Sequence, residues 1–393
     1  MDWANKLAPH YSDFNVSKRI LLSGHSHQAW PNVAKQGVLD CYQDAAKHVD
    51  EKWGAAFEKA DQVRDFYRGL MGEPQAQIAL GQSTHELILR FLSDLDSFKS
   101  PTNKPTKIIT TNGEFHSMRR QLDRLSELNI EVEVVDAFPT ETLAARIIEK
   151  LDAHTSAVMV SAVFFATSEI FHDVSKVALA AKSLNVPCLV DAYHALNVVP
   201  FNLVQWQLES AFIVGGGYKY CQAGEGNCFM RIPANYHGEP IITGWYAEFE
   251  LLDQAPNKVS YGKGQSAFAG STYDPTSHYR AAAVFEFFKQ QGLTDTVLND
   301  INKLQIATLW NGIAAMNLPK EVLALPKHDI ENNAGFLSLT TPKASDWVSA
   351  LNDRGILTDS RGDQLRFGPA PYLSNNQLSQ ALNAIEDIAV KLK

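Results

Sequence analysis

Short apolar runs alternate with amphipathic segments between about residue 83 and about residue 232. The runs have the length and composition of strands and include KIITT, EVEVV, SAVMVSAVFF, PCLVDA and SAFIVG. The segments between them have helical period, as in TETLAARIIEKL and VSKVALAAKSL. Strands that alternate with helices form βαβ units, so the pattern predicts an α/β fold with a largely parallel sheet covered on both faces.

The pattern changes after about residue 275. Two long helical patterns, SHYRAAAVFEFFKQQG and NKLQIATLWNGIAAM, lead into a tail that mixes the strand-like segments GFLSLTT and QLRFG with further helices. This mixture predicts a small α+β domain. We therefore divide the chain into an N-terminal segment at 1–50 that packs on the small domain, a large domain at 51–275 and a small C-terminal domain at 276–393. A chain of 393 residues exceeds the usual size of one hydrophobic core, which agrees with two domains.

Composition and charge exclude several classes of partner. Hydrophobic residues make up 45% and charged residues 20%, the balance of a globular protein. The net charge of −9 offers no basic surface for nucleic acid. The start, MDWANKLAPHYSDF, lacks the basic and apolar regions of a secretion signal, and no apolar run is long enough to span a bilayer. We expect a cytoplasmic protein with no membrane partner, whose four cysteines are reduced.

A carboxylate and an amine follow two successive predicted strands. LVDAYH ends a strand on Asp191, with His194 within one turn, and the next strand ends in GGGYKY, which contains Lys219. Ligands of parallel sheets bind at the carboxyl ends of the strands. Pyridoxal 5′-phosphate (PLP) uses a lysine for its Schiff base and a carboxylate at its pyridine nitrogen. Taken singly, the acid is typical of a turn and the lysine of a solvated surface, but together they predict a PLP site.

The stretch GQSTHELILRFL has the pattern of a phosphate cradle. A strand-like run ends at Gly81, and Ser83 and Thr84 then begin an amphipathic helix. Free backbone N–H groups at a helix N-terminus, together with two hydroxyls, favour an anion there. The alternative is an ordinary N-cap in which Glu86 completes a capping box with Ser83.

These residues resemble the class V aminotransferase group of PLP-dependent enzymes, fold type I, and within it the kynureninases. Kynureninases carry a D-x-A-H-type motif at a strand end, as in DAYH, and a lysine in a Y-K-Y context, as in YKY. LLSGHSHQAWP is similar to their LGNSLG-x-x-P turn, and LRFGPAPY to their I-R-x-x-P-x-P stretch. The resemblance covers most of the chain. It implies a seven-stranded, mostly parallel sheet, a small amino-acid substrate and a homodimer with shared active sites.

The resemblance also implies a role for each candidate residue. Lys219 would carry the cofactor and move protons at the substrate Cα, Asp191 would pair with the pyridine nitrogen, and His194 would buttress Asp191 or the ring. Phe115, in GEFHSMRRQ, would stack on the cofactor face. The implied phosphate ligands are Ser83, Thr84 and Tyr218, with Trp245 and Thr272 from the second subunit.

The resemblance also implies which residues bind the substrate. Arg366 would bind the substrate α-carboxylate through its planar fork, although a strand-end surface charge is the alternative. Ser26 and His48 complete the predicted substrate contacts, and for His48 a solvated helix histidine is the alternative.

The chain departs from the kynureninase pattern at several positions. His116, Ser117 and Met118 stand where kynureninases carry a P-S-D-type triplet. His25 replaces the asparagine of the N-terminal turn, and Thr272 aligns with an asparagine that helps to recognise the aryl ketone. These departures put the identity of the substrate in more doubt than the cofactor chemistry.

The preferred reaction is a kynureninase-like hydrolysis of a Cβ–Cγ bond that releases alanine, with Lys219 as the base at Cα and Tyr218 as the proton donor. The alternative is a class V aminotransferase or lyase that acts on another small amino acid. A third hypothesis is a cofactor-free scaffold, which predicts loss of Lys219, Asp191 or the phosphate cradle. Desulfuration is disfavoured because the loop GILTDSRGDQLRF contains no cysteine.

Overall fold

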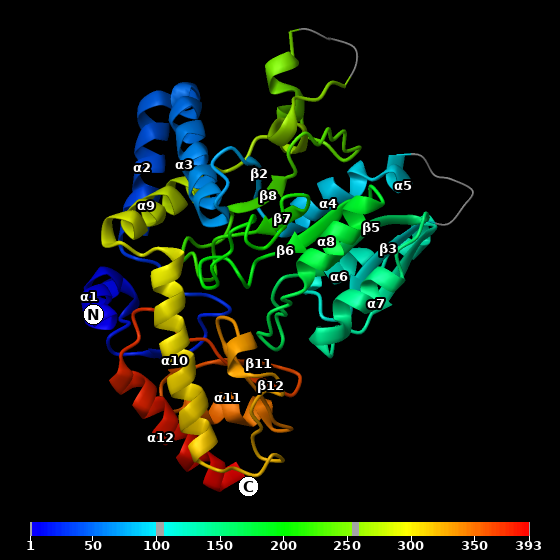
Figure 1. Ribbon diagram of the computed structural model, residues 1–393. Coiled ribbons are helices and arrows are strands. Elements are labelled where there is room, and N and C mark those ends of the chain that lie inside the picture. Colours follow the sequence, from blue (N-terminus) through cyan, green and yellow to red (C-terminus); the bar gives the residue numbers. More distant parts are fainter. Residues whose placement is uncertain (1, 100–105, 254–258, 393) are drawn as a thin grey trace.

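The computed structural model describes residues 2–99, 106–253 and 259–392. Within these residues, a seven-stranded sheet has the strand order β2-β8-β7-β6-β5-β3-β4 (Figure 1). Its strands are β2 (Gln77–Gly81), β3 (Thr106–Thr111), β4 (Ile130–Val135), β5 (Thr155–Ser161), β6 (Cys188–Asp191), β7 (Phe212–Gly215) and β8 (Cys228–Ile232). Only β8 pairs antiparallel, with β2 and β7 on its two sides. The predicted mostly parallel sheet is therefore confirmed.

The inner strands of the sheet are buried on both faces, whereas the edge strand β4 is partly exposed. Alternate residues of a strand point to opposite faces, and along β5 the side chains of Val158 and Val160 join one core cluster while Ala157 and Met159 join the other. The helices associated with the sheet are α4 (Thr84–Asp94), α6 (His116–Leu122), α7 (Leu143–Glu149) and α8 (Val174–Ser183). The continuous apolar runs of β5, β6 and β7 thus reflect strands with no solvent-facing side.

A second group of long helices precedes and follows the sheet in the sequence. Helices α2 (Val33–His48) and α3 (Trp53–Met71) both pack on α9 (Thr276–Gln291), and α3 also contacts β2 (Figure 1). Helix α9 ends where the sequence predicts, at Gly292, whose φ of 71° is one that glycine adopts without strain. The short helical elements are α1 (Trp3–Leu7), α5 (Asp96–Lys99), η1 (Ala8–Phe14), η2 (Val49–Lys52), η3 (Leu125–Leu128), η4 (Thr140–Thr142), η5 (Trp245–Leu251), η6 (Gly264–Phe268) and η7 (Ile330–Asn332).

The C-terminal part is a compact mixture of helices and short strands. It contains α10 (Asp295–Ala315), β9 (Leu337–Thr340), α11 (Ala344–Asn352), β11 (Asp359–Arg361), β12 (Gln364–Phe367) and α12 (Asn375–Leu392). Strands β11, β12 and β9 form an antiparallel sheet in that order. Strand β10 (Ile356–Leu357) pairs with β1 (Ile20–Leu21) near the N-terminus. This pairing ties residues 20–21 to the C-terminal part. The domain boundaries themselves stay predictions.

No helix in the described parts of the chain is both long and apolar enough to cross a bilayer. The predicted cytoplasmic location stays a prediction.

Candidate active site

A cavity of about 210 Å³ lies at the carboxyl ends of β5, β6 and β7. The strands end side by side, since Ser161 pairs in register with Asp191, and Asp191 with Val214. We call this space the lysine cavity. The sequence-predicted residues that line it are Ser83, Thr84, Phe115, Asp191, His194, Tyr218 and Lys219.

Lys219 lies in the loop after β7 and is only 5% exposed. Its Nζ is 2.5 Å from Nε2 of His194. Burial lowers the pKa of Lys219 to about 7, and nearby Arg366 adds to this effect while Asp191 opposes it. An amine with such a pKa is substantially unprotonated near neutral pH, so it is available as a nucleophile or a base.

Asp191 is the last residue of β6, and its Oδ1 accepts a hydrogen bond of 2.8 Å from the backbone N–H of Tyr193. Burial raises the pKa of Asp191, while this hydrogen bond and the charge of Lys219 work in the opposite direction. The ring of His194 contacts the lysine amine, and its predicted role beside Asp191 or the cofactor ring stays a prediction. Nδ1 of His194 is buried without a partner among the described residues.

Aromatic rings surround the amine of Lys219. The ring centres of Tyr193, Phe115 and Tyr218 lie 5.0, 5.3 and 5.6 Å from Nζ. Burial raises the pKa of Tyr218, so its hydroxyl keeps its proton at neutral pH. Tyr193 was missed by the sequence prediction, although it stands inside the DAYH motif between Asp191 and His194.

The start of α4 combines the two roles that the sequence left open. Oγ of Ser83 accepts the N–H of Glu86 at 3.4 Å, as an N-cap does. Glu86 in turn accepts the N–H of Gln82 at 3.3 Å, one residue earlier than a regular capping box. Because Ser83 and Thr84 also line the lysine cavity, capping and ligand binding do not exclude each other here. Their role as phosphate ligands stays a prediction.

Arg366 lies next to the lysine cavity rather than in its lining. Its guanidinium pairs with Asp359, with Nε 2.9 Å from Oδ1 and Nη2 2.6 Å from Oδ2. Nη1 donates to the carbonyl oxygen of Phe165, a residue of the cavity wall, at 2.9 Å. The alternative of an exposed strand-end charge is wrong, because Arg366 is only 4% exposed.

Besides Arg366, four predicted site residues lie outside the lysine cavity. Ser26 contacts its neighbour His27, whose ring stacks on Tyr218 at 4.8 Å. His48 is the last residue of α2 and lines neither this cavity nor the second one described below. Trp245 and Thr272 are exposed and contact each other, with Nε1 donating to Oγ1 at 3.3 Å. Their predicted contact with the cofactor of a second subunit stays a prediction.

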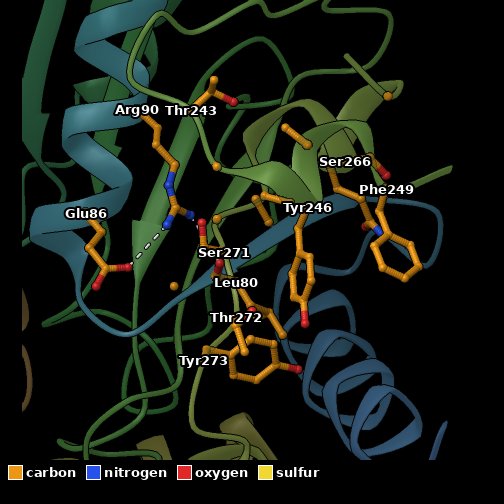
Figure 2. A pocket seen from close by; sticks show the side chains of 18 of the residues that line it. Leu80, Glu86, Arg90, Thr243, Tyr246, Phe249, Ser266, Ser271, Thr272 and Tyr273 are labelled. Atoms are coloured by element: carbon orange, nitrogen blue, oxygen red, sulfur yellow. Dashed lines mark hydrogen bonds and ion pairs between the residues drawn. The ribbon is translucent and has the colours of Figure 1, made fainter. Parts of the chain in front are cut away.

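A larger pocket of about 600 Å³ has Thr272 in its wall (Figure 2). Its wall carries Phe57, Tyr246, Phe249 and Tyr273, and we call it the aromatic pocket. Figure 2 also shows the ion pair between Glu86 and Arg90, 3.2 Å long, on its α4 side. His278 lines the pocket as well, and both its ring nitrogens are buried without a partner among the described residues.

A buried carboxyl group lies behind the lysine cavity and was missed by the sequence prediction. Glu114 accepts hydrogen bonds from the hydroxyls of Ser161 at 2.5 Å and Thr111 at 2.6 Å. Burial raises the pKa of Glu114 to about 7, and these hydrogen bonds oppose the shift. No pattern in the sequence marks this acid, which simply precedes Phe115. In the described residues, no group of three or more His, Cys, Asp or Glu side chains is placed to hold a metal ion.

Comparison with known proteins gives two curated relatives that span nearly the whole chain. A kynureninase of Yarrowia lipolytica is 24% identical over 406 residues, covering 91% of this chain and 88% of the relative. An uncharacterized aminotransferase of Bacillus subtilis is 20% identical over 382 residues, covering 96% and 95%. No family model matches.

Solved structures agree with the fold. The apo cysteine desulfurase of Thermococcus onnurineus has a TM-score of 0.80 at 17% identity and covers 99% of this chain and 98% of its own. A C-DES mutant with glycine covalently linked to PLP has a TM-score of 0.83 at 15% identity and covers 96% and 98%. At these identities the likeness concerns the fold alone.

Proposed function

We propose that the chain is a class V aminotransferase-like enzyme, kynureninase-like at low sequence identity, and that its lysine cavity binds PLP for chemistry on a small amino acid. The observation that carries this proposal is the convergence of Lys219 and Asp191 in one buried cavity. Two residues from different strand ends, an amine with its pKa lowered to about 7 and a carboxylate, face the same space. A cofactor-free scaffold has no use for this arrangement.

The residues present fit the cofactor. When bound, PLP supplies an aldehyde that condenses with an amine and a pyridine ring that accepts electrons. Lys219 offers the amine, Asp191 offers a carboxylate whose Oδ1 is already fixed by a backbone N–H, and Phe115 offers an aromatic face. Ser83 and Thr84 at the start of α4 would hold the phosphate.

We propose that the reaction is a kynureninase-like hydrolysis of a Cβ–Cγ bond that releases alanine. Lys219 Nζ would take the proton from the substrate Cα, since an amine with a pKa of about 7 is a base at working pH. The hydroxyl of Tyr218, which keeps its proton at neutral pH, would donate at the substrate carbonyl oxygen. Arg366 would bind the α-carboxylate from beside the cavity.

The alternative is an aminotransferase or lyase acting on another small amino acid. It is favoured by the Bacillus subtilis relative, which covers more of this chain than the kynureninase does, and by the substitutions on the substrate side. Desulfuration stays disfavoured in spite of the desulfurase-like fold. Cys228 lines the lysine cavity, but burial raises the pKa of its thiol to about 12, and the loop before Arg366 holds no cysteine.

We propose further that two copies of the chain form a homodimer in which each subunit completes the other's site. The apolar side chains of Ile241, Ile242, Trp245, Phe249 and Leu252 are all exposed around η5. A sequence-continuous set of exposed apolar residues is typical of a protein interface. Such an interface would bring Trp245 and Thr272 against the partner's lysine cavity, as the resemblance implies.

The proposal is tested by the purified protein with added PLP and kynurenine. We expect a visible absorbance band from lysine-bound cofactor, and formation of alanine and anthranilate detected by chromatography. In Lys219→Ala both should disappear, while a matched surface change, Lys176→Ala, should leave both in place. A wild-type protein that stays colourless with PLP would overturn cofactor binding. A band without anthranilate would instead favour the aminotransferase or lyase.

A further inference from the structure

Three charged or titratable side chains, two from one strand pair and one from near the N-terminus, form a cluster beside the lysine cavity. Arg366 comes from β12, Asp359 from β11, and His25 from the turn after β1. His25 is 1% exposed, and Asp359 connects the other two residues. The kynureninase resemblance has an asparagine at position 25, so this histidine is one of the departures that the proposed function leaves unexplained.

The hydrogen bonds of Arg366 leave a defined part of the guanidinium free. Of its five N–H donors, Asp359 takes one on Nε and one on Nη2, and the carbonyl of Phe165 takes one on Nη1. Among the described residues, two donors therefore have no partner, one on each terminal nitrogen. A carboxylate is bound in a bidentate manner by one donor from each of two nitrogens.

Asp359 provides the counter-charge that keeps the guanidinium buried. A buried arginine without a paired carboxylate carries an uncompensated desolvation penalty, so it would turn toward solvent. Arg361 lies near the same carboxylate, but at 3.7 Å and on the exposed side, so it does not replace Arg366 in this pair.

His25 fixes the orientation of Asp359. Its Nε2 is 2.7 Å from Oδ1 of Asp359, and its ring stacks on Phe336 with centres 4.7 Å apart. Burial lowers the pKa of His25 to about 4, so the ring is neutral at pH 7 and donates the Nε2 proton to Asp359. Space for the ring exists because residue 368 is glycine, where a Cβ would lie 2.4 Å from Nδ1 of His25.

Phe336 connects this cluster with the reactive amine. Its ring centre is 5.7 Å from Cζ of Arg366 and 5.5 Å from the ring centre of His194, and His194 contacts Lys219. The arginine and the lysine are thus connected through two packed rings, and the charge of Arg366 also lowers the pKa of Lys219.

We propose that Asp359 and His25 are positioning residues that hold Arg366 as a fork for a single substrate carboxylate. The inference rests on the proposed function, in which the substrate is a small amino acid. It assigns a role to the departure at His25: the histidine supplies the donor that keeps Asp359, and through it Arg366, in one orientation. The cluster therefore decides how strongly the enzyme distinguishes a carboxylate ligand from the same amine without that charge.

The test compares L-alanine with L-alaninamide, which lacks the carboxylate. Each is titrated into PLP-loaded protein, and the dissociation constant is read from the change of the visible spectrum. The ratio of the two constants measures the contribution of the carboxylate site. Because charge-assisted bidentate pairs are among the stronger hydrogen bonds, we expect the wild type to favour L-alanine by roughly tenfold to a hundredfold. Asp359→Asn should reduce this preference by about tenfold or more and change the alaninamide constant by less than about threefold.

Two substitutions at position 25 separate positioning from folding. His25→Gln keeps an N–H donor at a similar reach and should retain most of the preference, whereas His25→Ala should lose much of it. Arg361→Gln is the matched control and should leave the ratio unchanged. Thermal unfolding of the cofactor-free variants shows whether each is folded.

The outcomes distinguish this inference from the proposed function. A folded Asp359→Asn protein with an unchanged or increased preference for L-alanine would overturn the inference, and so would equal weakening of both ligands. If His25→Gln and His25→Ala lose the preference to the same extent, the donor role of His25 is wrong. A wild-type protein whose visible spectrum responds to neither ligand would remove the amino-acid site itself, and with it the proposed function.

Discussion

The lysine cavity and the aromatic pocket differ in the way the fold builds them. The lysine cavity has a volume of about 210 Å³ and is lined mainly by residues at strand ends and at the start of α4, with Lys219 and Asp191 buried. The aromatic pocket has a volume of about 600 Å³ and is formed largely by η5, η6 and the segments beside them (Figure 2). Trp245, which is 43% exposed, stands between the lining residues Gly244 and Tyr246 in the sequence.

This difference indicates which parts of the site one chain can complete alone. The sheet fixes the groups of the lysine cavity through its register, and burial then shifts their pKa values. Around Trp245 the contacts are local: its ring meets Tyr246 and Phe249, yet the side chain stays 43% exposed. We therefore expect a substitution at Lys219 or Asp191 to impair the cavity of its own subunit, and a substitution at Trp245 to impair the cavity of the partner subunit.

The largest effect is expected at Asp191. Asp191→Asn keeps the shape of the side chain but removes the buried charge that faces Lys219, so turnover should fall by about a thousandfold, typical of a lost electrostatic contact in a water-poor site. Steady-state kinetics with the substrate that the wild type cleaves measures this. The exposed acid Glu141 provides the matched control, as Glu141→Gln. A loss of less than about tenfold would contradict the role of Asp191.

The rate at which PLP attaches to Lys219 should depend on pH, and Asp191→Asn should shift that dependence. Lys219 must be unprotonated to attach PLP, and its pKa of about 7 predicts an attachment rate that rises with pH up to about 7 and then levels off. Because the charge of Asp191 opposes the lowering of that pKa, Asp191→Asn should move the rise to lower pH. Stopped-flow absorbance of cofactor-free protein mixed with PLP follows the rate. A rise centred near the ordinary lysine value of about 10.4 would contradict the buried environment.

A smaller effect is expected at Trp245. Loss of an aromatic contact in Trp245→Ala should weaken PLP binding by about tenfold. If Trp245 serves the partner's cavity, a mixed dimer of Trp245→Ala and Lys219→Ala subunits, purified through two different tags, should bind one cofactor with wild-type affinity. The intact cavity then faces the subunit that retains Trp245. Weak binding in the mixed dimer would place the role of Trp245 within its own chain.

Much of this organisation could be predicted from the sequence because the sheet is so regular. The apolar runs gave the parallel strands, and the DAYH and GGGYKY motifs gave the cavity, since strand order brings their ends together. Strand β8, which contains Cys228, was missed because its short run follows a glycine-rich loop with no helix between, and its pairing is antiparallel.

Long-range pairs could not be predicted in the same way. Asp359 and His25 lie far apart in the chain and meet only through tertiary packing, so the sequence around one residue does not predict its contact with the other. Glu114 has the same limitation, because its raised pKa results from burial behind Ser161 and not from a local pattern. Residues that act through a neighbour leave a weaker trace in the sequence than residues at motif positions.

The smallest effect on catalysis, and a distinct effect on stability, is expected at Glu114. Its carboxyl lies behind the lysine cavity, so Glu114→Gln should change turnover by less than about threefold. In the folded protein its pKa is about 7, above that of an unfolded glutamate, so the folded state holds this proton over a pH range in which the unfolded state has lost it. The resulting contribution to stability is fully present below about pH 4.3 and is lost as the pH rises through 7.

Between pH 4 and pH 8 the free energy of unfolding of the wild type should therefore fall by on the order of 3 kcal/mol relative to that of Glu114→Gln. Each unit of pKa difference between the folded and unfolded states corresponds to about 1.4 kcal/mol. Urea unfolding of both cofactor-free proteins across this range measures the difference. Thr111 and Ser161 donate to the carboxylate and limit the shift, so removing one hydroxyl with Ser161→Ala should steepen the pH dependence. If the difference between wild type and Glu114→Gln stays constant with pH, Glu114 is not a buried acid that titrates near neutrality. The lysine cavity would then lie over a hydrated space rather than a dry sheet interior.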